Sequence, residues 1–203
     1  MKKIINTLKA NIILRDRKKN NEKIMLNIGC GTDYKQGWIN IDNNSENNIK
    51  KLDLKWDLRC ALPFPDDCVD FIYSEHFFEH LTVDEGKKSL RDFFRVLKKG
   101  GVMRTSMPNL KDVVEMYLNP EWKKSCMIKK FGLDYIQTSA EMINVSFRHW
   151  GHKWLYDYEE LKRRLVEIGC VNIEQCLLGQ SKYDDLKNLE IRNESTLIVE
   201  VTK

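Results

Sequence analysis

The sequence predicts an α/β protein built on a doubly wound, mostly parallel sheet. Residues Ile24–Asp42 read as a short apolar strand, a Gly-Cys-Gly turn and a second strand that ends in an acid. Strand and helix patterns then alternate along residues 62–107 and again along residues 158–201. With 203 residues, of which 42% are hydrophobic, the chain is expected to form a single domain with a buried core.

Composition narrows the class of protein. No apolar run approaches the roughly 18–20 residues that span a bilayer, and the basic N-terminus lacks the apolar core of a secretory signal. The six cysteines form no C-x-x-C pair, which favours reduced thiols and a cytoplasmic location. The net charge of +4 is modest and does not favour a nucleic-acid partner.

The Gly-Cys-Gly turn is the first candidate binding site. Gly29 and Gly31 let backbone approach a ligand closely, and Asp42 stands where a carboxylate can accept hydrogen bonds from ribose hydroxyls. Only about ten residues separate Gly31 from Asp42, whereas a parallel crossover usually takes a dozen or more. The first crossover helix is therefore predicted to be shortened or absent. Because a pyrophosphate needs that helix's N-terminus, this argues against NAD and for a phosphate-free nucleoside.

The segment LNIGCG at Leu26–Gly31 resembles the first motif of the class I S-adenosylmethionine-dependent methyltransferases. The resemblance implies a Rossmann-like methyltransferase sheet with an antiparallel C-terminal strand. It also implies S-adenosylmethionine as the cofactor and S-adenosylhomocysteine as the product. The cofactor-binding residues that it implies in this first part of the chain are Asn27, Gly29, Cys30, Gly31 and Asp42.

The next strand is predicted from strict alternation of Leu52, Leu54 and Trp56 with polar residues. It ends at Asp57-Leu58. The same resemblance assigns Asp57 to the adenine amino group and lays Leu58 against the ring. Asp53 is the rival acid, but its mid-strand position predicts a solvent-facing side chain.

The segment Leu62–Leu81 resembles the fourth-strand region of the same family. Val69–Tyr73 is the predicted buried strand, and Ser74, Glu75 and His76 follow at its carboxyl end. Because ligands bind outside those ends in open parallel sheets, these three residues are expected to line the methionine and methyl-donor side.

The rest of the chain continues the alternation. Thr82 and Glu85 form a capping-box pattern, and residues 111–150 read as a helical insertion that the resemblance places on the acceptor side. The remaining predicted elements are a helix from Thr82 to Gly100-Gly101, a strand Val102–Met107, a helix Tyr158–Ile168, and strands Val171–Leu178 and Thr196–Val201.

Histidines supply the candidate catalytic residues. Methyl transfer chiefly requires donor and acceptor to be held at near-attack distance, and a base is needed only for a hydroxyl or a protonated amine. His76 is the first candidate for that base, followed by His149 and His152. Each of these could instead pack or cap, as could His80.

A metal site is the alternative for the same segment. The run EHFFEH at Glu75–His80 has two histidines four residues apart, flanked by Glu75 and Glu79. The order is not the H-E-x-x-H of zinc proteases, and the resemblance already accounts for the segment. No metal site is therefore predicted.

The acceptor follows only from a closer resemblance. The Gly-Trp-x-Asn-x-Asp opening and the EHL and RVLK-GG segments resemble small bacterial methyltransferases found with surface-polysaccharide synthesis. This implies a small hydroxylated acceptor such as a sugar or glycan precursor. The alternatives are an RNA methyltransferase and a non-catalytic S-adenosylmethionine-binding module.

Residues 1–23 are basic and carry Ile4, Ile5, Leu8 and Ile12 at helical spacing. A cap helix that packs on the domain is the favoured interpretation. Peripheral contact with an anionic membrane is the alternative.

Overall fold

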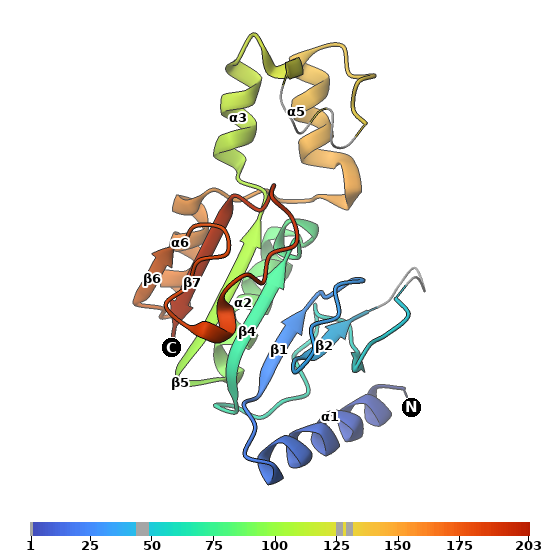
Figure 1. Ribbon diagram of the computed structural model, residues 1–203, viewed down its shortest axis with the longest axis vertical. Helices are drawn as coiled ribbons and strands as arrows, with labels where there is room; N and C mark the ends of the chain where they lie inside the picture. The colour runs from blue at the N-terminus through green and yellow to red at the C-terminus, as the bar shows by residue number, and fades with distance from the viewer. Residues whose placement is uncertain (1, 44–48, 125–127, 129–131) are drawn as a thin grey trace.

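The computed structural model describes residues 2–43, 49–124, 128 and 132–203. Within these residues, seven strands form one sheet in the order β3-β2-β1-β4-β5-β7-β6 (Figure 1). The first five positions in that order pair in parallel, and β7 pairs antiparallel with both β5 and β6. The predicted sheet, with its antiparallel C-terminal strand, is confirmed. The strands are β1 (Met25–Ile28), β2 (Ile39–Asp42), β3 (Leu54–Lys55), β4 (Val69–Glu75), β5 (Leu97–Met107), β6 (Asn172–Gln175) and β7 (Leu197–Thr202).

Helices lie at both ends of the sheet and behind it. The α-helices described are α1 (Lys2–Lys19), α2 (Val83–Val96), α3 (Leu110–Leu118), α5 (Ser139–Arg148) and α6 (Tyr158–Glu167). Four 3₁₀ turns join them: η1 (Phe78–His80), η2 (Trp122–Lys124), η3 (His149–Gly151) and η4 (Asp184–Leu186). Figure 1 shows α3 and α5 standing beyond the carboxyl ends of the strands, with α1 at the opposite end of the molecule. We call α3, η2, α5 and η3 together the helical lobe.

The first crossover contains no helix, as the sequence predicts. Residues 29–38, all of which are described, form turns between β1 and β2. Both faces of the sheet are nevertheless covered by other elements. Leu161 and Leu165 of α6 join α2 in the main core, and Leu186 of η4 packs with Tyr73 and Val102 in a second cluster.

The Thr82 capping box is present, but the helix and strand boundary after it was predicted wrongly. Thr82 Oγ1 accepts from the Glu85 N–H, and α2 ends at Val96. The chain then enters β5 at Leu97, so Gly100 and Gly101 lie inside the strand rather than before it. A Cβ on Gly101 would come within 2.9 Å of the Lys98 carbonyl oxygen, which explains why a glycine is needed there.

Two edge strands are shorter than the sequence pattern predicts. β3 covers only Leu54–Lys55, and β6 covers Asn172–Gln175 rather than Val171–Leu178. Each pairs with one neighbour only. Val171 and Leu177 are exposed, so the apolar pattern that predicted a longer β6 does not correspond to burial.

The helical lobe has a small core of its own. Its buried side chains belong to Trp122, Ile128, Leu133, Ile136 and Met142, and they form a cluster separate from the sheet core. Residues 125–127 and 129–131 of the predicted insertion lie outside the described residues.

The N-terminal helix packs on the domain, but not through the predicted stripe. Ala10 and Leu14 are buried in the main core, and Asn6 Nδ2 donates to the Lys55 carbonyl at 2.6 Å. Ile4, Ile5, Leu8 and Ile12 are instead 57–66% exposed. The periodicity correctly predicted a helix but assigned its packing face to the wrong side. None of the described helices is both long and apolar enough to cross a membrane.

Candidate active site

The turn after β1 adopts a conformation that its glycines permit. Gly29 has a φ of 64° and Gly31 a φ of 51°, both in the left-handed region. The N–H groups of Gly29 and Cys30 donate to the Ile41 carbonyl at 2.9 and 3.2 Å. The Gly31 N–H donates to Asp42 Oδ2 at 3.0 Å. The turn and the acid at the end of β2 therefore form one hydrogen-bonded unit.

The two glycines differ in their surroundings. A Cβ on Gly29 would lie 2.8 Å from Phe77 Cδ2, whereas a Cβ on Gly31 would meet nothing within 4 Å. Phe77 thus covers one side of the turn and leaves space beside Gly31 and Asp42. Between them, Cys30 is buried, and burial raises the pKa of its thiol to about 12, with the Asp42 carboxylate adding to the effect. The Cys30 thiol stays protonated at neutral pH.

Side-chain hydrogen bonds replace the missing first helix. Asn40 is fully buried, and its Oδ1 accepts from Asn27 Nδ2 at 2.9 Å and from the Lys35 N–H at 2.8 Å. Asp53 Oδ2 accepts from the Asn40 N–H and Oδ1 accepts from Tyr34 Oη. The prediction that Asp53 faces solvent is wrong, because its carboxylate anchors the loop that carries the turn. Asn27 likewise supports the turn, since it also donates to the Asp33 carbonyl at 2.8 Å.

Asp57 and Leu58 follow β3. Leu58 is buried, whereas Asp57 is half-buried and paired with Arg59. Arg59 Nε and Nη2 donate to the two Asp57 oxygens at 2.8 and 2.7 Å, and these bonds lower the pKa of the carboxyl. An adenine amino group would have to share this carboxylate with Arg59.

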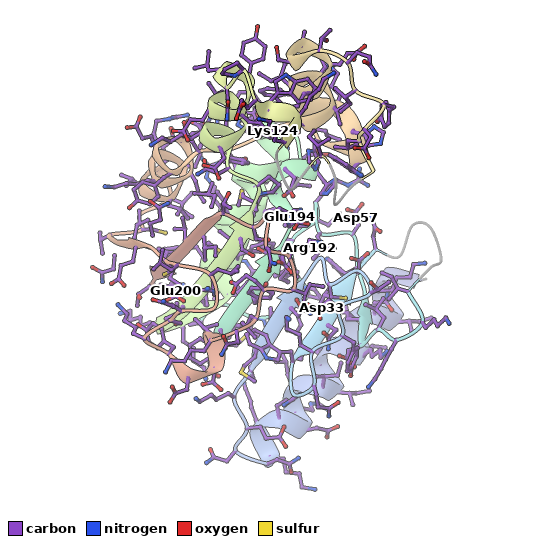
Figure 2. All side chains as sticks on the ribbon, turned by 45° about the horizontal axis from the view of Figure 1, so that its top comes forward. Asp33, Asp57, Lys124, Arg192, Glu194 and Glu200 are labelled. Atoms are coloured by element: carbon purple, nitrogen blue, oxygen red, sulfur yellow. The ribbon has the colours of Figure 1, made fainter. Side chains whose placement is uncertain are left out.

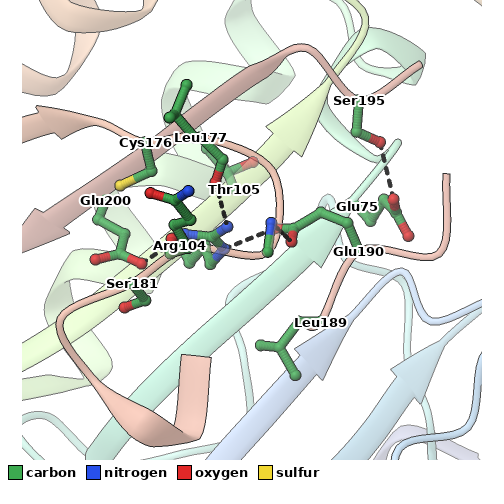
Figure 3. A network of polar contacts seen from close by, with 12 residues as sticks. Glu75, Arg104, Thr105, Cys176, Leu177, Ser181, Leu189, Glu190, Ser195 and Glu200 are labelled. Carbon is green, nitrogen blue, oxygen red and sulfur yellow. Dashed lines mark hydrogen bonds and ion pairs between the residues drawn. The ribbon is translucent and has the colours of Figure 1, made fainter. Parts of the chain in front are cut away.

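The polar side chains at the end of β4 make hydrogen bonds to other parts of the protein. Ser74 Oγ lies 2.9 Å from Thr105 Oγ1 on β5. The Glu75 carboxylate is buried and accepts from the Ile191 N–H and the Arg192 N–H. It also accepts from Ser195 Oγ (Figure 3). Both side chains are thus occupied by contacts within the protein. Glu75 fastens the segment before β7 across the strand end.

His76 follows in a strained backbone conformation, with a φ of 50°. Its Nε2 lies 3.1 Å from Ser195 Oγ, and its Nδ1 lies 3.1 Å from Glu79 Oε1. The imidazole is therefore held between a hydroxyl and a buried carboxylate. A nearby carboxylate favours the protonated form of an imidazole.

A cavity of about 1090 Å³ lies between the carboxyl ends of β4 and β5, the segment before β7, and the helical lobe. His76, His80 and His152 line it, together with Trp122 and Trp150. Lys124 of the helical lobe lies above Arg192 and Glu194 of the segment before β7 (Figure 2). The other polar lining residues are Asn109, Asp112, Glu115, Asn119, Glu121, Ser146, Asn193 and Thr196. None of the predicted cofactor-binding residues lines this cavity, so the cavity does not contain the Gly29–Gly31 turn.

Two residues of the cavity wall stand out by their backbone geometry. Five non-glycine residues among those described have a positive φ, and three of them are Asn or Asp, which tolerate it. The other two are His76 and Trp150, and both line the cavity. Strain of this kind concentrates at functional sites.

The structure separates the three remaining histidines. The rings of His80 and His152 lie 5.1 Å apart at the cavity, and burial lowers the pKa of His80. His149 is exposed, packs edge-on against Trp150 and does not line the cavity. Of the predicted catalytic residues, His76 and His152 are brought to one cavity and His149 is not.

Comparison with known proteins agrees with this arrangement. Residues 26–105 match the sequence model of a family described as a methyltransferase domain. A SAM-dependent methyltransferase from Archaeoglobus fulgidus superposes with a TM-score of 0.51 at 16% identity, covering 95% of this chain and 94% of its own. One from Thermotoga maritima gives 0.49 at 16% identity, covering 90% and 83%. No curated protein matches the sequence.

The matched family segment runs from β1 to β5 and contains the turn, Asp42 and the end of β4. This segment of the chain is similar to a methyltransferase domain, and the chain as a whole shares the fold of the Archaeoglobus fulgidus protein.

Sequence reasoning missed three residues of this candidate site. Glu79 is fully buried beside His76. From the sequence it was considered only as a ligand in the metal site that was not predicted. Ser195 contacts His76 across 119 positions of the chain, and Arg192 reaches the cavity from the same segment. No local pattern could have found these two, because the connection between β6 and β7, residues 176–196, has no periodicity.

Proposed function

We propose that the protein is a class I methyltransferase that binds S-adenosylmethionine across the carboxyl ends of β1, β2 and β4. The backbone of Gly29–Gly31 and the carboxylate of Asp42 would hold the nucleoside, with Asp57 and Leu58 on the adenine side. The hydrogen bond from Gly31 to Asp42 supports this, because it fixes the carboxylate beside the open part of the turn. Asn27, Ser74 and Glu75 would act indirectly, through the loops that they fasten.

The acceptor we propose is a small hydroxylated molecule such as a sugar or glycan precursor. The cavity carries this proposal, because its volume of about 1090 Å³ is at the upper end of the range of small-molecule sites. Trp122 and Trp150 offer flat apolar surfaces, and three asparagine amides offer both donors and acceptors. This mixture suits the apolar faces and hydroxyl edges of a sugar.

The charges at the cavity weigh against RNA. Four carboxylates line it, those of Asp112, Glu115, Glu121 and Glu194, against the two cations Lys124 and Arg192. Phosphate binding requires a surplus of positive charge. A neutral or cationic acceptor is therefore favoured over a polynucleotide.

Methyl transfer to a hydroxyl requires removal of its proton, and we propose that His76 is the base. When bound, S-adenosylmethionine supplies an electrophilic methyl group on sulfur. With its ring hydrogen on Nδ1, toward Glu79 Oε1 at 3.1 Å, His76 would take the hydroxyl proton at Nε2, and the Glu79 carboxylate would stabilise the charged ring. The acceptor hydroxyl would first have to displace Ser195 Oγ, which lies 3.1 Å from Nε2 and donates its own hydrogen to Glu75. The walls of the cavity would position the acceptor, which supplies much of the acceleration.

The test is a kinetic comparison of His76→Gln with the unaltered enzyme. We expect kcat to fall by about 10²- to 10⁴-fold, because a positioned base contributes that much. The affinity for S-adenosylhomocysteine, measured by calorimetry, should change by less than about threefold. An unchanged kcat would exclude His76 as the base. A loss confined to cofactor affinity would make it a binding residue instead.

We also propose peripheral contact of α1 with an anionic membrane. Ile4, Ile5, Leu8 and Ile12 form an exposed apolar stripe on the side of α1 away from the core residues Ala10 and Leu14. Exposed basic residues accompany the stripe: Lys9, Arg15, Lys18 and Lys19. An apolar stripe bordered by cations complements an anionic lipid surface.

We infer a reducing compartment such as the cytoplasm for this enzyme. Among the described residues, Cys30, Cys60, Cys68, Cys170 and Cys176 are free thiols. Cys126 lies outside the described residues. Free thiols are typical of a reducing compartment.

A further inference from the structure

Glu79 carries a carboxylate that is buried next to the cavity-lining histidines and has few partners. Its side chain is fully buried in η1, and neither carboxylate oxygen has a hydrogen-bond partner among the described residues. His76 Nδ1 lies 3.1 Å from Oε1, close enough for an ion pair but without the direction of a hydrogen bond. Because a buried carboxylate is costly unless it is paired or coordinates a metal, Glu79 lacks sufficient compensation.

Two histidines converge on the same carboxylate. The ligand atoms of Glu79, His80 and His152 all lie within 4.8 Å of one another. A first-row ion takes its donors at about 2.0–2.2 Å, so two donors on one ion lie at most about 4.4 Å apart. Small side-chain rotations would therefore bring all three donors onto one ion.

The second contacts of the histidines suit metal binding. His152 Nδ1 lies 2.7 Å from the Ser146 carbonyl oxygen, which can only accept, so Nδ1 carries the hydrogen and Nε2 is left to coordinate. His80 Nδ1 lies close to the backbone of Gly151. Histidine ligands in metal sites generally donate their other N–H as His152 does, which fixes the tautomer and the ring.

We propose that Glu79, His80 and His152 bind a divalent first-row transition ion, with zinc as the reference case. Two imidazoles and one carboxylate are a ligand set of zinc and of non-haem iron(II), and three protein ligands leave further positions open. His80 and His152 line the cavity, so an open position faces the acceptor.

The role of the ion rests on the proposed function. An acceptor oxygen in the open position would be polarised, and its proton would be easier for His76 to remove. Glu79 can serve both partners, because one carboxylate oxygen faces His76 and the other remains for the ion. The acceptor class that this favours is a molecule whose reacting hydroxyl, or a neighbouring oxygen, can coordinate a metal.

Metal binding itself is the first test. Untagged full-length protein, treated with chelator and dialysed, is titrated with Zn²⁺ by calorimetry and with Co²⁺ by visible absorption. We expect one ion per chain and a tetrahedral or five-coordinate cobalt spectrum. Glu79→Gln and His152→Gln should weaken binding by more than the roughly 10–100-fold that outer-shell changes cost.

Two variants serve as matched controls. His149→Gln removes the exposed histidine of η3, and Glu159→Gln removes an exposed carboxylate of α6. Both should bind the ion as the unaltered protein does. Thermal unfolding of each variant shows that it is folded, and a folded Glu79→Gln protein that keeps full affinity overturns the proposal.

The remaining outcomes separate the metal site from the proposed function. If no stoichiometric binding occurs, or if His149→Gln loses as much affinity as His152→Gln, the metal site is overturned. Methyl transfer by chelated protein then still tests the small-molecule function by itself. If the ion binds as expected and no small hydroxylated molecule is methylated, the proposed function fails while the metal site stands.

Discussion

At the scale of single residues, the turn after β1 shows how two glycines in one motif do different jobs. Gly31 provides a left-handed conformation in open space, beside the acid that receives its N–H. Gly29 provides the same conformation and also makes room for the ring of Phe77. The motif therefore couples the cofactor turn to the segment that carries His76 and Glu79.

Replacing each glycine by alanine distinguishes these two roles. Gly31→Ala should lower the free energy of unfolding by about 1–2 kcal/mol, the cost of a left-handed L-residue. Gly29→Ala should cost about 1–3 kcal/mol more, because its Cβ would lie 2.8 Å from Phe77 Cδ2 and the ring must move. Denaturant unfolding without cofactor measures both. Equal losses for the two variants would mean that Phe77 does not constrain the turn.

Residues also mark where sequence reasoning succeeded and where it could not. The Gly-x-Gly turn and Asp42 could be placed next to each other, because the short loop leaves them little freedom. The alternation around Asp53 predicted a solvent-facing side chain, because it could not reveal that Asn40 and Tyr34 donate hydrogen bonds to the carboxylate. His152 and His149 were indistinguishable by spacing. Only the folded structure shows that His152 lines the cavity and His149 does not.

At the scale of elements, the connection between β6 and β7 is held by two buried ionic anchors rather than by secondary structure. Arg104 of β5 is fully buried, with Nε 2.6 Å from Glu190 Oε1 and Nη1 2.7 Å from Glu200 Oε1 (Figure 3). Arg104 Nη1 also donates to the Gln180 carbonyl at 2.9 Å. Glu75 forms the second anchor by accepting from the Arg192 N–H and Ser195. The segment that brings Arg192 and Glu194 to the cavity is thus fixed at both ends.

Removing the first anchor should be costly. Arg104→Leu would leave Glu190 and Glu200 buried without their cation, and such a loss typically costs about 3–5 kcal/mol. Lys98→Leu on the same strand is the matched control, because its ion pair with Asp70 is half exposed and worth at most about 1 kcal/mol. Chemical unfolding of both variants measures the difference. Similar losses would show that the buried network is not a stabilising anchor.

Elements were predicted best where the signal is local. The predicted helix starts at the Thr82 capping box and at Tyr158 are correct for α2 and α6, since each start is capped by a side chain that accepts the N–H three positions further on. The start of β5 was missed, because Gly100 and Gly101 indicate a stop by composition, whereas the strand pairs with β4 on both sides of them, at Leu97 and from Val102 onward, with a register shift between. Sheet pairing is a long-range property that no window of sequence contains.

At the scale of the whole molecule, α1 and the helical lobe lie at opposite ends of the sheet (Figure 1). The cavity is lined partly by the helical lobe, so it lies far from the exposed stripe of α1. A membrane bound at α1 would therefore leave the cavity open to the aqueous phase. The sequence predicted a basic amphipathic helix. Only the folded structure shows that Ala10 and Leu14 pack into the core while the apolar stripe remains exposed.

Vesicle co-sedimentation tests this arrangement. The enzyme should bind vesicles that contain phosphatidylserine more tightly than neutral ones, and high salt should weaken the binding. Replacing Ile5 and Leu8 by Asn should reduce the binding by at least about tenfold, because two large apolar side chains no longer insert. Val171→Asn, an exposed apolar position outside α1, is the control and should have no effect. Equal binding by both variants would rule out α1 as the contact.

The central claim is that this methyltransferase transfers a methyl group to a small hydroxylated molecule in the cavity beside His76. The most direct measurement supplies the purified enzyme with methyl-labelled S-adenosylmethionine and, separately, the small-molecule and RNA fractions of a cell extract. Mass spectrometry should find a small hydroxylated compound that gains one methyl group, and His76→Gln should abolish that product. Label in the RNA fraction, or cofactor binding with no labelled product in either fraction, would contradict the account.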